Sequence, residues 1–301
     1  MSAPDLPVAG TPDRRKQTLI AILATCVAYG YFNIGDAAVK VLAGKFHFSQ
    51  IIIFNCIVII SFMCVYGAVT QGRSAFVIKQ PKWVFLRAAM SVVVGIINTL
   101  SLPHIQLTTF YTLVFTSPFW VAILSAFFLR EKLEKEKIAV ILFCFAVIVY
   151  IFRPGGGMFD LWAILVLCGA FFYSCSMIVM RHLGPHESRT MIICSGSVFS
   201  ILACLPFLPF HYITPSLYDL GVFLMMGVLG AIGVMCIAFG FQTAPSAATV
   251  APYHYTQIFW GALLGYYLFD EVPDQRTLIG AAVIIGAGLF LIWREARRKS
   301  L

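Results

Sequence analysis

Long apolar runs alternate with short polar segments along the whole chain. Each run holds 15 to 25 residues, and an α-helix of about 20 residues crosses the roughly 30 Å hydrocarbon core of a bilayer. The connections between runs are mostly shorter than ten residues, so no separate soluble domain is expected. The pattern predicts ten membrane-spanning helices, of which the fifth and tenth are short: Thr18–Val39, Ser49–Thr70, Trp83–Ile105, Leu107–Leu129, Ile138–Phe152, Phe159–Met180, Met191–Phe210, Leu217–Phe241, Ser246–Phe269 and Leu278–Trp293.

The positive charges fix an orientation for these ten helices. If the N-terminus lies in the cytoplasm, seventeen of the 21 Lys and Arg residues fall in or beside cytoplasmic segments. Cytoplasmic loops of membrane proteins carry an excess of Lys and Arg. With an even number of spans, both termini are then cytoplasmic. The remaining four basic residues lie on the outside: Lys40, Lys45, Arg153 and Arg276.

Composition agrees with a membrane protein. Hydrophobic residues make up 60% of the 301 and charged residues 11%, about half the charge of a soluble domain. Basic cytoplasmic segments account for the net charge of +8 without a nucleic-acid partner. All nine cysteines fall within apolar runs and none forms a C-x-x-C pair, so neither a metal site nor a disulfide framework is predicted. The polar first sixteen residues and the long first span argue against a cleaved signal peptide.

The chain also contains an internal repeat. At an offset of 140 residues, "TTFYTLVFTSPFWVAILSAFFLREK" aligns with "AATVAPYHYTQIFWGALLGYYLFDEV" without gaps. The fourth span therefore repeats as the ninth, and each half holds five spans. Because five is odd, the halves enter the membrane from opposite sides, an inverted repeat typical of secondary transporters. We predict repeats at 17–153 and 154–295, between cytoplasmic tails at 1–16 and 296–301. The identical pairs are Thr109/Thr249, Thr116/Thr256, Phe119/Phe259, Trp120/Trp260, Leu124/Leu264 and Glu131/Glu271.

Two stretches carry a resemblance to a known family. "FTSPFWVAILSAFFLREKLEKEKIAVILFCFAVIVYIFRPG" and "APYHYTQIFWGALLGYYLFDEVPDQRTLIGAAVIIGAGLFLIWRE" resemble the ends of the two EamA-type repeats of the drug/metabolite transporter superfamily. The resemblance covers about residues 17–295 and implies a ten-helix carrier. The second stretch is most similar to members described as carriers of S-adenosylmethionine or amino-acid-like metabolites. Many members have Arg in the second span, where this chain has Asn55, so that position is not expected to hold an anionic substrate.

The polar stretch "APYHYTQIFW" points to the substrate site. His254 is the ninth residue of its span, about 12 Å into a core of roughly 30 Å. Pro252 and Pro118 each free a backbone carbonyl near the middle of a span. Interrupted helices at matching places in two inverted halves are typical of a transporter site. The alternative is that both prolines only kink their helices.

Two faces of the ninth span compete for the cavity. Tyr253, Gln257 and Trp260 share one face at helical spacing, which suits stacking, cation–π contact and an orienting amide. His254 lies on the neighbouring face, where it is either a neutral, hydrogen-bonded side chain or a carrier of a coupling proton. The alternative for the first face is an aromatic seam between helices.

Asp36 is the one carboxylate well inside a predicted span. Asn33, Asp36 and Lys40 follow one face of the first span, and Asp36 and Lys40 are spaced to pair. Asp36 is a candidate to bind a substrate amine or a coupling proton, and the alternative is a pair that anchors the helix end. Further substrate candidates are Tyr111, Thr112, Thr116 and Asn98, whereas Glu131 and Glu271 are expected in gate or interface contacts at opposite faces.

These features predict an all-α integral membrane protein that works as a secondary active transporter. We expect it to move a small polar or zwitterionic metabolite, such as an amino acid or S-adenosylmethionine, by alternating access. The chain has no P-loop, so ATP is not expected to drive transport, and no cofactor is predicted. Proton coupling and a homodimer remain open, and the expected location is a bacterial inner membrane. The alternatives are an exporter of drugs or other organic solutes, a channel or scaffold, and an intramembrane enzyme, for which no convergent catalytic set exists in the sequence.

Overall fold

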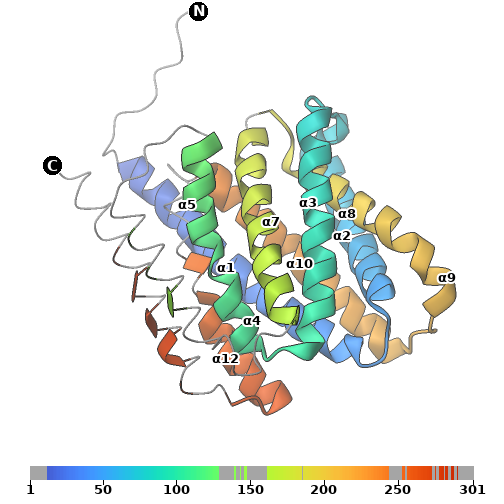
Figure 1. Cartoon of the computed structure of the whole chain (residues 1–301). Coiled ribbons are helices and arrows are strands. Elements are labelled where there is room, and N and C mark those ends of the chain that lie inside the picture. Colours follow the sequence, from blue (N-terminus) through green and yellow to red (C-terminus); the bar gives the residue numbers. More distant parts are fainter. Residues whose placement is uncertain are drawn as a thin grey trace, which may run out of the picture.

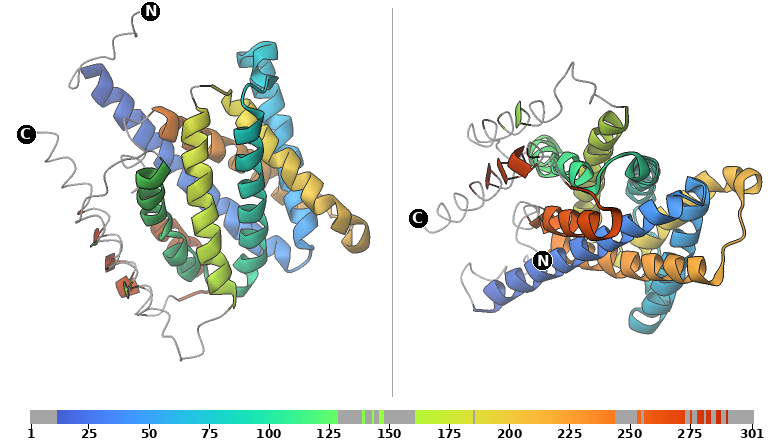
Figure 2. Two further views of the ribbon diagram at one scale, coloured as in Figure 1. Left: turned by 45° about the horizontal axis from the view of Figure 1, so that its top comes forward. Right: turned by 90° about the horizontal axis from the view of Figure 1, so that it is seen from below.

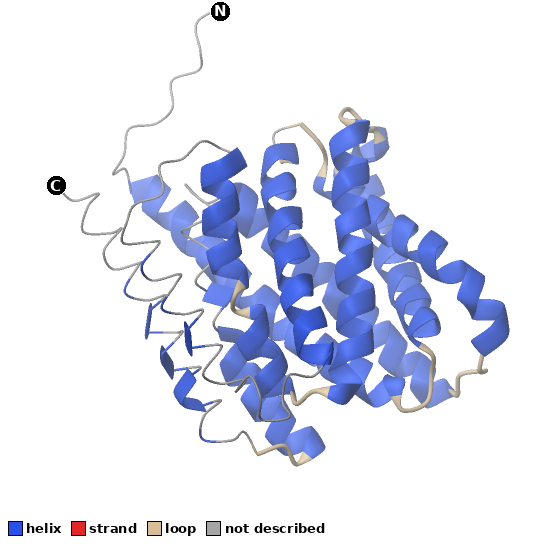
Figure 3. Ribbon diagram, in the orientation of Figure 1, coloured by secondary structure: helices blue, strands red, loops and turns tan. Residues whose placement is uncertain are grey.

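The computed structural model shows a bundle of helices (Figure 1). Throughout the described residues, every regular element is a helix and none is a strand (Figure 3). The structure describes residues 12–128, 161–184, 186–243, 253–254 and 256–272, together with scattered positions within 139–147 and 275–290.

The helices begin and end close to the predicted apolar runs. Three short 3-10 helices, η1 (Gly72–Phe76), η2 (Leu102–His104) and η3 (Leu205–Phe207), lie in the connections. The α-helices are α1 (Pro12–Ala43), α2 (Phe48–Thr70), α3 (Pro81–Ser101), α4 (Leu107–Val114), α5 (Ser117–Phe128), α7 (Leu161–Leu183), α8 (Arg189–Cys204), α9 (Leu208–His211), α10 (Leu217–Thr243) and α12 (Thr256–Phe269).

Six of the helical segments described are long and apolar enough to cross a membrane. Large apolar side chains on them face outward, among them Leu23, Val65 and Leu217, as expected where the surrounding solvent is lipid. The protein is therefore an integral membrane protein of the all-α class. The predicted fifth span and most of the tenth lie outside the described residues, so ten spans remains a prediction.

The predicted fourth span is not one helix. It divides into α4 and α5 at Phe115 and Thr116, where the Thr116 amide bonds to the Leu113 carbonyl at 3.0 Å instead of continuing the α-helical pattern. Pro118 stands at the second position of α5, where its missing N–H removes no helical hydrogen bond. In the predicted ninth span, α12 begins at Thr256, after 3-10 geometry at Tyr253 and His254, and the first part of this span lies outside the described residues.

The most extensive helix contacts join the first half of the chain to the second. α1 lies along α10, α2 along α8, and α3 along α7 (Figure 2). Additional contacts pair α2 with α10, α3 with α8, α1 with α12, and α4 with both α7 and α12. The two halves of the chain are thus interleaved along the whole bundle.

Small residues let α10 approach its neighbours closely. Gly233 lies against Phe32 of α1, where an added Cβ would come within 2.8 Å of the ring. Gly240 lies against Ala21 and Thr25, and Gly227 against Val58 of α2, with no room for a side chain. Lipid tails are as apolar as the side chains, so close packing of this kind holds membrane helices together.

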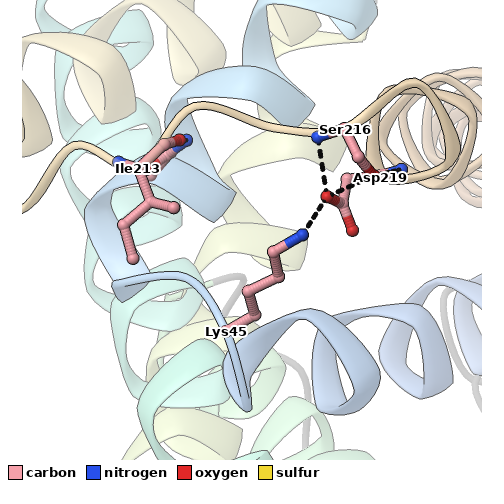
Figure 4. Close-up of polar contacts among 5 residues, drawn as sticks. Lys45, Ile213, Ser216 and Asp219 are labelled. Carbon is pink, nitrogen blue, oxygen red and sulfur yellow. Dashed lines mark hydrogen bonds and ion pairs between the residues drawn. The ribbon is translucent and has the colours of Figure 1, made fainter.

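Polar contacts tie the loop before α10 to the first half of the chain (Figure 4). Lys45 pairs with Asp219, whose carboxylate also accepts the backbone N–H of Ser216 at 2.8 Å. The buried amide of Gln50 makes two bonds to the backbone of Ile213, at 2.7 and 3.0 Å. These contacts close the end of the bundle that carries Lys40 and Lys45, which we name the Lys40 end.

Replacing Gly240 with Val should destabilise the bundle, because the added methyl groups meet the backbone carbonyl of Ala21 and the side chain of Thr25. Overpacking of this kind costs about 1–3 kcal/mol, so we expect a lower melting temperature for the detergent-purified protein. Gly221→Val, on the same helix and with open space around it, is the matched control. Equal melting temperatures for the two variants would contradict the close approach of α1 and α10.

Candidate functional site

A cavity of about 200 Å³ lies inside the bundle. Its wall combines aromatic side chains with one carboxylate, two amides and one imidazole. It is lined from α1 by Tyr29, Phe32 and Asp36, from α3 by Val94 and Asn98, from α4 by Phe110, Tyr111 and Val114, from α7 by Gly169, Ala170 and Tyr173, and from α12 and the turn before it by Gln257 and His254.

His254 is enclosed by aromatic rings. Its imidazole stacks on Tyr29, with ring centroids 4.4 Å apart and an angle of 9° between the planes. Phe115 meets it edge-on at 5.8 Å and Tyr173 lies at 5.5 Å. The His254 side chain is 4% exposed, so it forms a fixed part of the cavity wall.

The 3-10 turn explains which side chains of this segment face the cavity. Since Tyr253 and His254 precede α12, the helical spacing that joined Tyr253, Gln257 and Trp260 on one face does not hold. Gln257 and His254 line the cavity. Trp260 is 40% exposed and its indole lies beside Gly30 of α1, so the predicted three-residue face is divided.

Asp36 is bound by a tyrosine. The hydroxyl of Tyr111 donates to the Asp36 carboxylate at 2.9 Å, joining α4 to α1. Gly261 of α12 packs directly on the Tyr111 ring, which holds the phenol in place. Asp36 makes no ion pair within the described part of the chain, so a carboxylate lines the cavity without a neutralising cation.

Lys40 does not pair with Asp36, as the sequence spacing allowed. It pairs with Glu271 and also donates to the carbonyl of Ile105 at 3.0 Å. The second carboxylate oxygen of Glu271 accepts the backbone N–H of Leu107 at 2.8 Å. That N–H is the first of α4, and the positive end of a helix attracts a carboxylate.

The turn that ends α12 carries Glu271 to this position. Asp270 adopts a left-handed backbone conformation, with φ of 52°, and the amide of Glu271 bonds back to the carbonyl of Gly265 at 3.0 Å. The chain thereby reverses direction after α12. Glu271 then joins α12, α4 and α1 at the Lys40 end.

Three predicted residues bond within their own helices. Asn33 donates to the Tyr29 carbonyl at 2.7 Å, Thr112 to Thr108 at 2.8 Å and Thr116 to Leu113 at 2.9 Å. None of the three lines the cavity. Glu131 and Pro252, and the side chain of Pro118, lie outside the described residues.

Sequence reasoning gave no special weight to the aromatic residues of α1. Tyr29 and Phe32 line the cavity, but in an apolar run their letters look like ordinary membrane-helix residues. The only available signal was their position one and two turns before Asp36 on the same helix. Asn98, named from the sequence, does line the cavity.

Apolar helices long enough to cross a membrane surround a cavity that contains polar side chains, an arrangement that suits an integral membrane carrier. Residues 160–294 match the EamA-like transporter family. The match covers the second half of the chain, which is similar to the EamA-type carriers of the drug/metabolite transporter superfamily, and together with the relatives below it supports a transporter rather than an enzyme.

Relatives of known function align over most of the chain. An S-adenosylmethionine uptake transporter of Rickettsia bellii is 25% identical over 270 residues, which cover 88% of this chain and 90% of that protein. The pseudopaline exporter CntI of Pseudomonas aeruginosa is 24% identical and covers 91% of this chain and 94% of its own length. A solved crystal structure, 14% identical, superposes with a TM-score of 0.70 over 94% of this chain and 99% of its own, which shows a shared fold.

The two ion pairs at the Lys40 end should differ in strength. Lys40 and Glu271 have side chains 14% and 10% exposed, whereas Lys45 beside Asp219 is 49% exposed. Exposed pairs contribute about 0.2–1 kcal/mol, and breaking a buried pair costs about 3–5 kcal/mol. We expect Glu271→Gln to lower the melting temperature more than Asp219→Asn does.

A double-mutant cycle separates the pair itself from other effects. Lys40→Met with Glu271→Gln should be less destabilising than the sum of the single changes, because each single change leaves a charge unpaired. Additive shifts in melting temperature would show that Lys40 and Glu271 do not depend on each other.

Proposed function

We propose that this protein is a secondary carrier for a cationic or zwitterionic amino-acid metabolite of the S-adenosylmethionine type, working by alternating access in a bacterial inner membrane. The observation that carries the proposal is the Asp36 carboxylate, which lines an aromatic cavity and has no cationic partner among the described residues. The names of the two kinds of relative, one for uptake and one for export, support a metabolite as substrate.

The cavity suits a positively charged organic group. A carboxylate attracts an ammonium or sulfonium ion, and this attraction is strong where water is scarce. Tyr29, Phe110 and Tyr173 add ring faces for cation–π contact. Asn98 and Gln257 supply amides, and the Oε1 atom of Gln257 is buried without a hydrogen-bond partner. A substrate amine or hydroxyl would satisfy that oxygen.

The volume of the cavity supports a closed state. Sites for drug-sized ligands usually measure about 300–1,000 Å³, and this cavity has about 200 Å³. A metabolite the size of S-adenosylmethionine would therefore enter only after the surrounding helices separate. Alternating access provides such a separation on each side in turn.

The helix contacts support two inverted five-helix repeats, at 17–153 and 154–295. The repeat relates α1 to α7, α2 to α8, α3 to α10, and α4 with α5 to α12. When each helix is exchanged for its repeat mate, the contact of α1 with α10 becomes that of α7 with α3. Similarly, the contact of α2 with α10 becomes that of α8 with α3, and the contact of α1 with α12 becomes that of α7 with α4 and α5. Both members of each exchanged pair are present, as a pseudo-two-fold axis requires.

The helix interruptions also correspond. At the repeat offset of 140 residues, the break at Phe115 and Thr116 aligns with Tyr255 and Thr256, where α12 begins. Both interruptions lie beside the cavity, since Phe115 contacts His254. Interrupted helices at the midplane, between inverted halves, are the usual location of a transporter site.

The contacts of Glu271 support a closed gate on the outer side. Lys40 belongs to the few basic residues that the charge distribution places outside. In this arrangement the Lys40–Glu271 pair and the Leu107 contact hold α1, α4 and α12 together above the cavity. Opening toward the outside would require these bonds to break, and Glu131 is the corresponding residue on the cytoplasmic side.

Counterflow in proteoliposomes tests the substrate class. We expect the purified protein to exchange labelled S-adenosylmethionine and to discriminate against S-adenosylhomocysteine, which lacks the sulfonium charge. Asp36→Asn should weaken binding tenfold or more, the equivalent of about 1.4 kcal/mol. Tyr111→Phe, which leaves the carboxylate in place, should have a smaller effect.

Asp219→Asn is the control, because it removes a carboxylate at the Lys40 end that does not line the cavity. It should leave the affinity unchanged. The proposal fails if wild-type protein exchanges none of the cationic or zwitterionic metabolites offered, or if Asp36→Asn binds them as tightly as the wild type.

A further inference from the structure

Arg87 is a buried cation that the positive-inside count treated as a cytoplasmic charge. It is the seventh residue of α3 and only 6% exposed. One guanidinium nitrogen, Nη1, donates to the carbonyl of Ile192 on α8 at 2.5 Å. The Nε atom is buried and has no hydrogen-bond partner.

No carboxylate neutralises Arg87 among the residues that the structure describes. A buried charge costs several kcal/mol unless it is paired, and an ionisable group inside a membrane protein usually marks a substrate or ion pathway. The single carbonyl of Ile192 satisfies only one of five guanidinium N–H groups. The remaining capacity suits a planar anion such as a carboxylate, which an arginine binds through two parallel bonds.

The position of Arg87 relates it to the cavity. Arg87, Ser91, Val94 and Asn98 recur at helical spacing along one face of α3, and Val94 and Asn98 line the cavity. The rise of the helix places Arg87 about 10 Å along the axis from Val94.

The helices that face this stretch of α3 carry glycine there. An added Cβ at Gly196 of α8 would lie 3.2 Å from Nη1 of Arg87 and 3.5 Å from Ser91. Gly169 of α7 lies in the same way against Asn98 and Ile97. At these two points the facing helix presents backbone, which brings no side-chain charge to compete for Arg87.

We propose that Arg87 is a second substrate-binding position, which receives the carboxylate of the metabolite when α3 separates from α7 and α8. This inference rests on the proposed function, in which Asp36 holds the cationic group. On binding, Arg87 exchanges its bond to the Ile192 carbonyl for two bonds to the carboxylate. The site therefore selects compounds with a cation and a carboxylate over compounds with a cation alone.

Decarboxylated S-adenosylmethionine keeps the sulfonium and the amine and lacks the carboxylate, so it tests binding of the cationic group without binding of the carboxylate. We expect wild-type protein in proteoliposomes to prefer S-adenosylmethionine at least tenfold. Arg87→Gln should abolish this preference while exchange of the decarboxylated compound continues. Arg87→Lys keeps the charge without the two-pronged geometry and should retain a part of the preference.

Arg189→Gln is the matched control, since Arg189 lies near the same end of the bundle and bonds to Gln242 rather than facing Arg87. It should keep the full preference. An unchanged preference in Arg87→Gln and Arg87→Lys, or equal use of both compounds by the wild type, overturns the proposal. If Arg87→Gln does not fold, the preference for S-adenosylmethionine over the decarboxylated compound, measured for Arg87→Lys and for the wild type, still tests the proposal.

A substrate-independent measurement distinguishes failure of this inference from failure of the proposed function. Sodium acetate at fixed ionic strength, compared with sodium chloride, should raise the melting temperature of the wild type, raise that of Arg87→Lys less, and leave that of Arg87→Gln unchanged. If no metabolite is exchanged and this acetate effect is present, the carboxylate site stands and the proposed substrate class is wrong. If acetate has no Arg87-dependent effect and no preference is seen, the carboxylate site is wrong.

Discussion

The absence of water from the bilayer core is the constraint on which this structure depends. Backbone groups are satisfied within helices, so every polar side chain in the core needs a partner or a cavity. The described residues meet this need at two levels. At the Lys40 end, Glu271 and Asp219 have cationic partners. Deeper in the bundle, Asp36 has only a neutral tyrosine and Arg87 a backbone carbonyl. Asp36 lines the cavity, and Arg87 lies on the same helix as the lining residues Val94 and Asn98, so these two charges lie where a carrier would need affinity for a charged solute.

The same constraint determines how the helices pack. Without a hydrophobic driving force between helices, close contact of small residues has to provide cohesion, as Gly233 and Gly240 do between α10 and α1. The main contacts join the two halves of the chain, so any opening of the cavity must shift helices along these seams. Because α10 presents glycine to α1 at these positions, few side chains interlock there, and one helix can shift along the other. The breaks at Phe115 and before Thr256 allow the parts of the interrupted spans to move separately.

The class of fold could be read from the sequence because apolar length and hydrophobicity depend on each residue alone. The positions of α1 to α3 and of α10 follow the apolar runs within a few residues, apart from the extended start of α1. His254, Asp36, Tyr111 and Asn98 were found because a polar letter in an apolar run is conspicuous. The sequence did not show the helical register of the residues before α12. Tyr253 and His254 form a 3-10 turn, so helical spacing from Tyr253 to Trp260 misplaced the face. The partner of Lys40 was also hidden, because Glu271 lies 231 positions away and reaches it through a turn at Asp270.

An inverted repeat gives a symmetric frame, yet the charges within it are not symmetric. At the offset of 140 residues, Asp36 corresponds to Ser176 and Arg87 to Gly227. Gly227 packs against Val58 with no room for a side chain, so the second half has no place for a counterpart of Arg87 in this packing. A symmetric pathway would bind a substrate equally well in two opposite orientations. With a carboxylate on α1 and a guanidinium on α3, one orientation is favoured, the cationic end toward Asp36 and the anionic end toward Arg87. In the proposed carrier, the inverted repeat provides two halves that can alternate, and the unmatched charges of Asp36 and Arg87 provide selectivity.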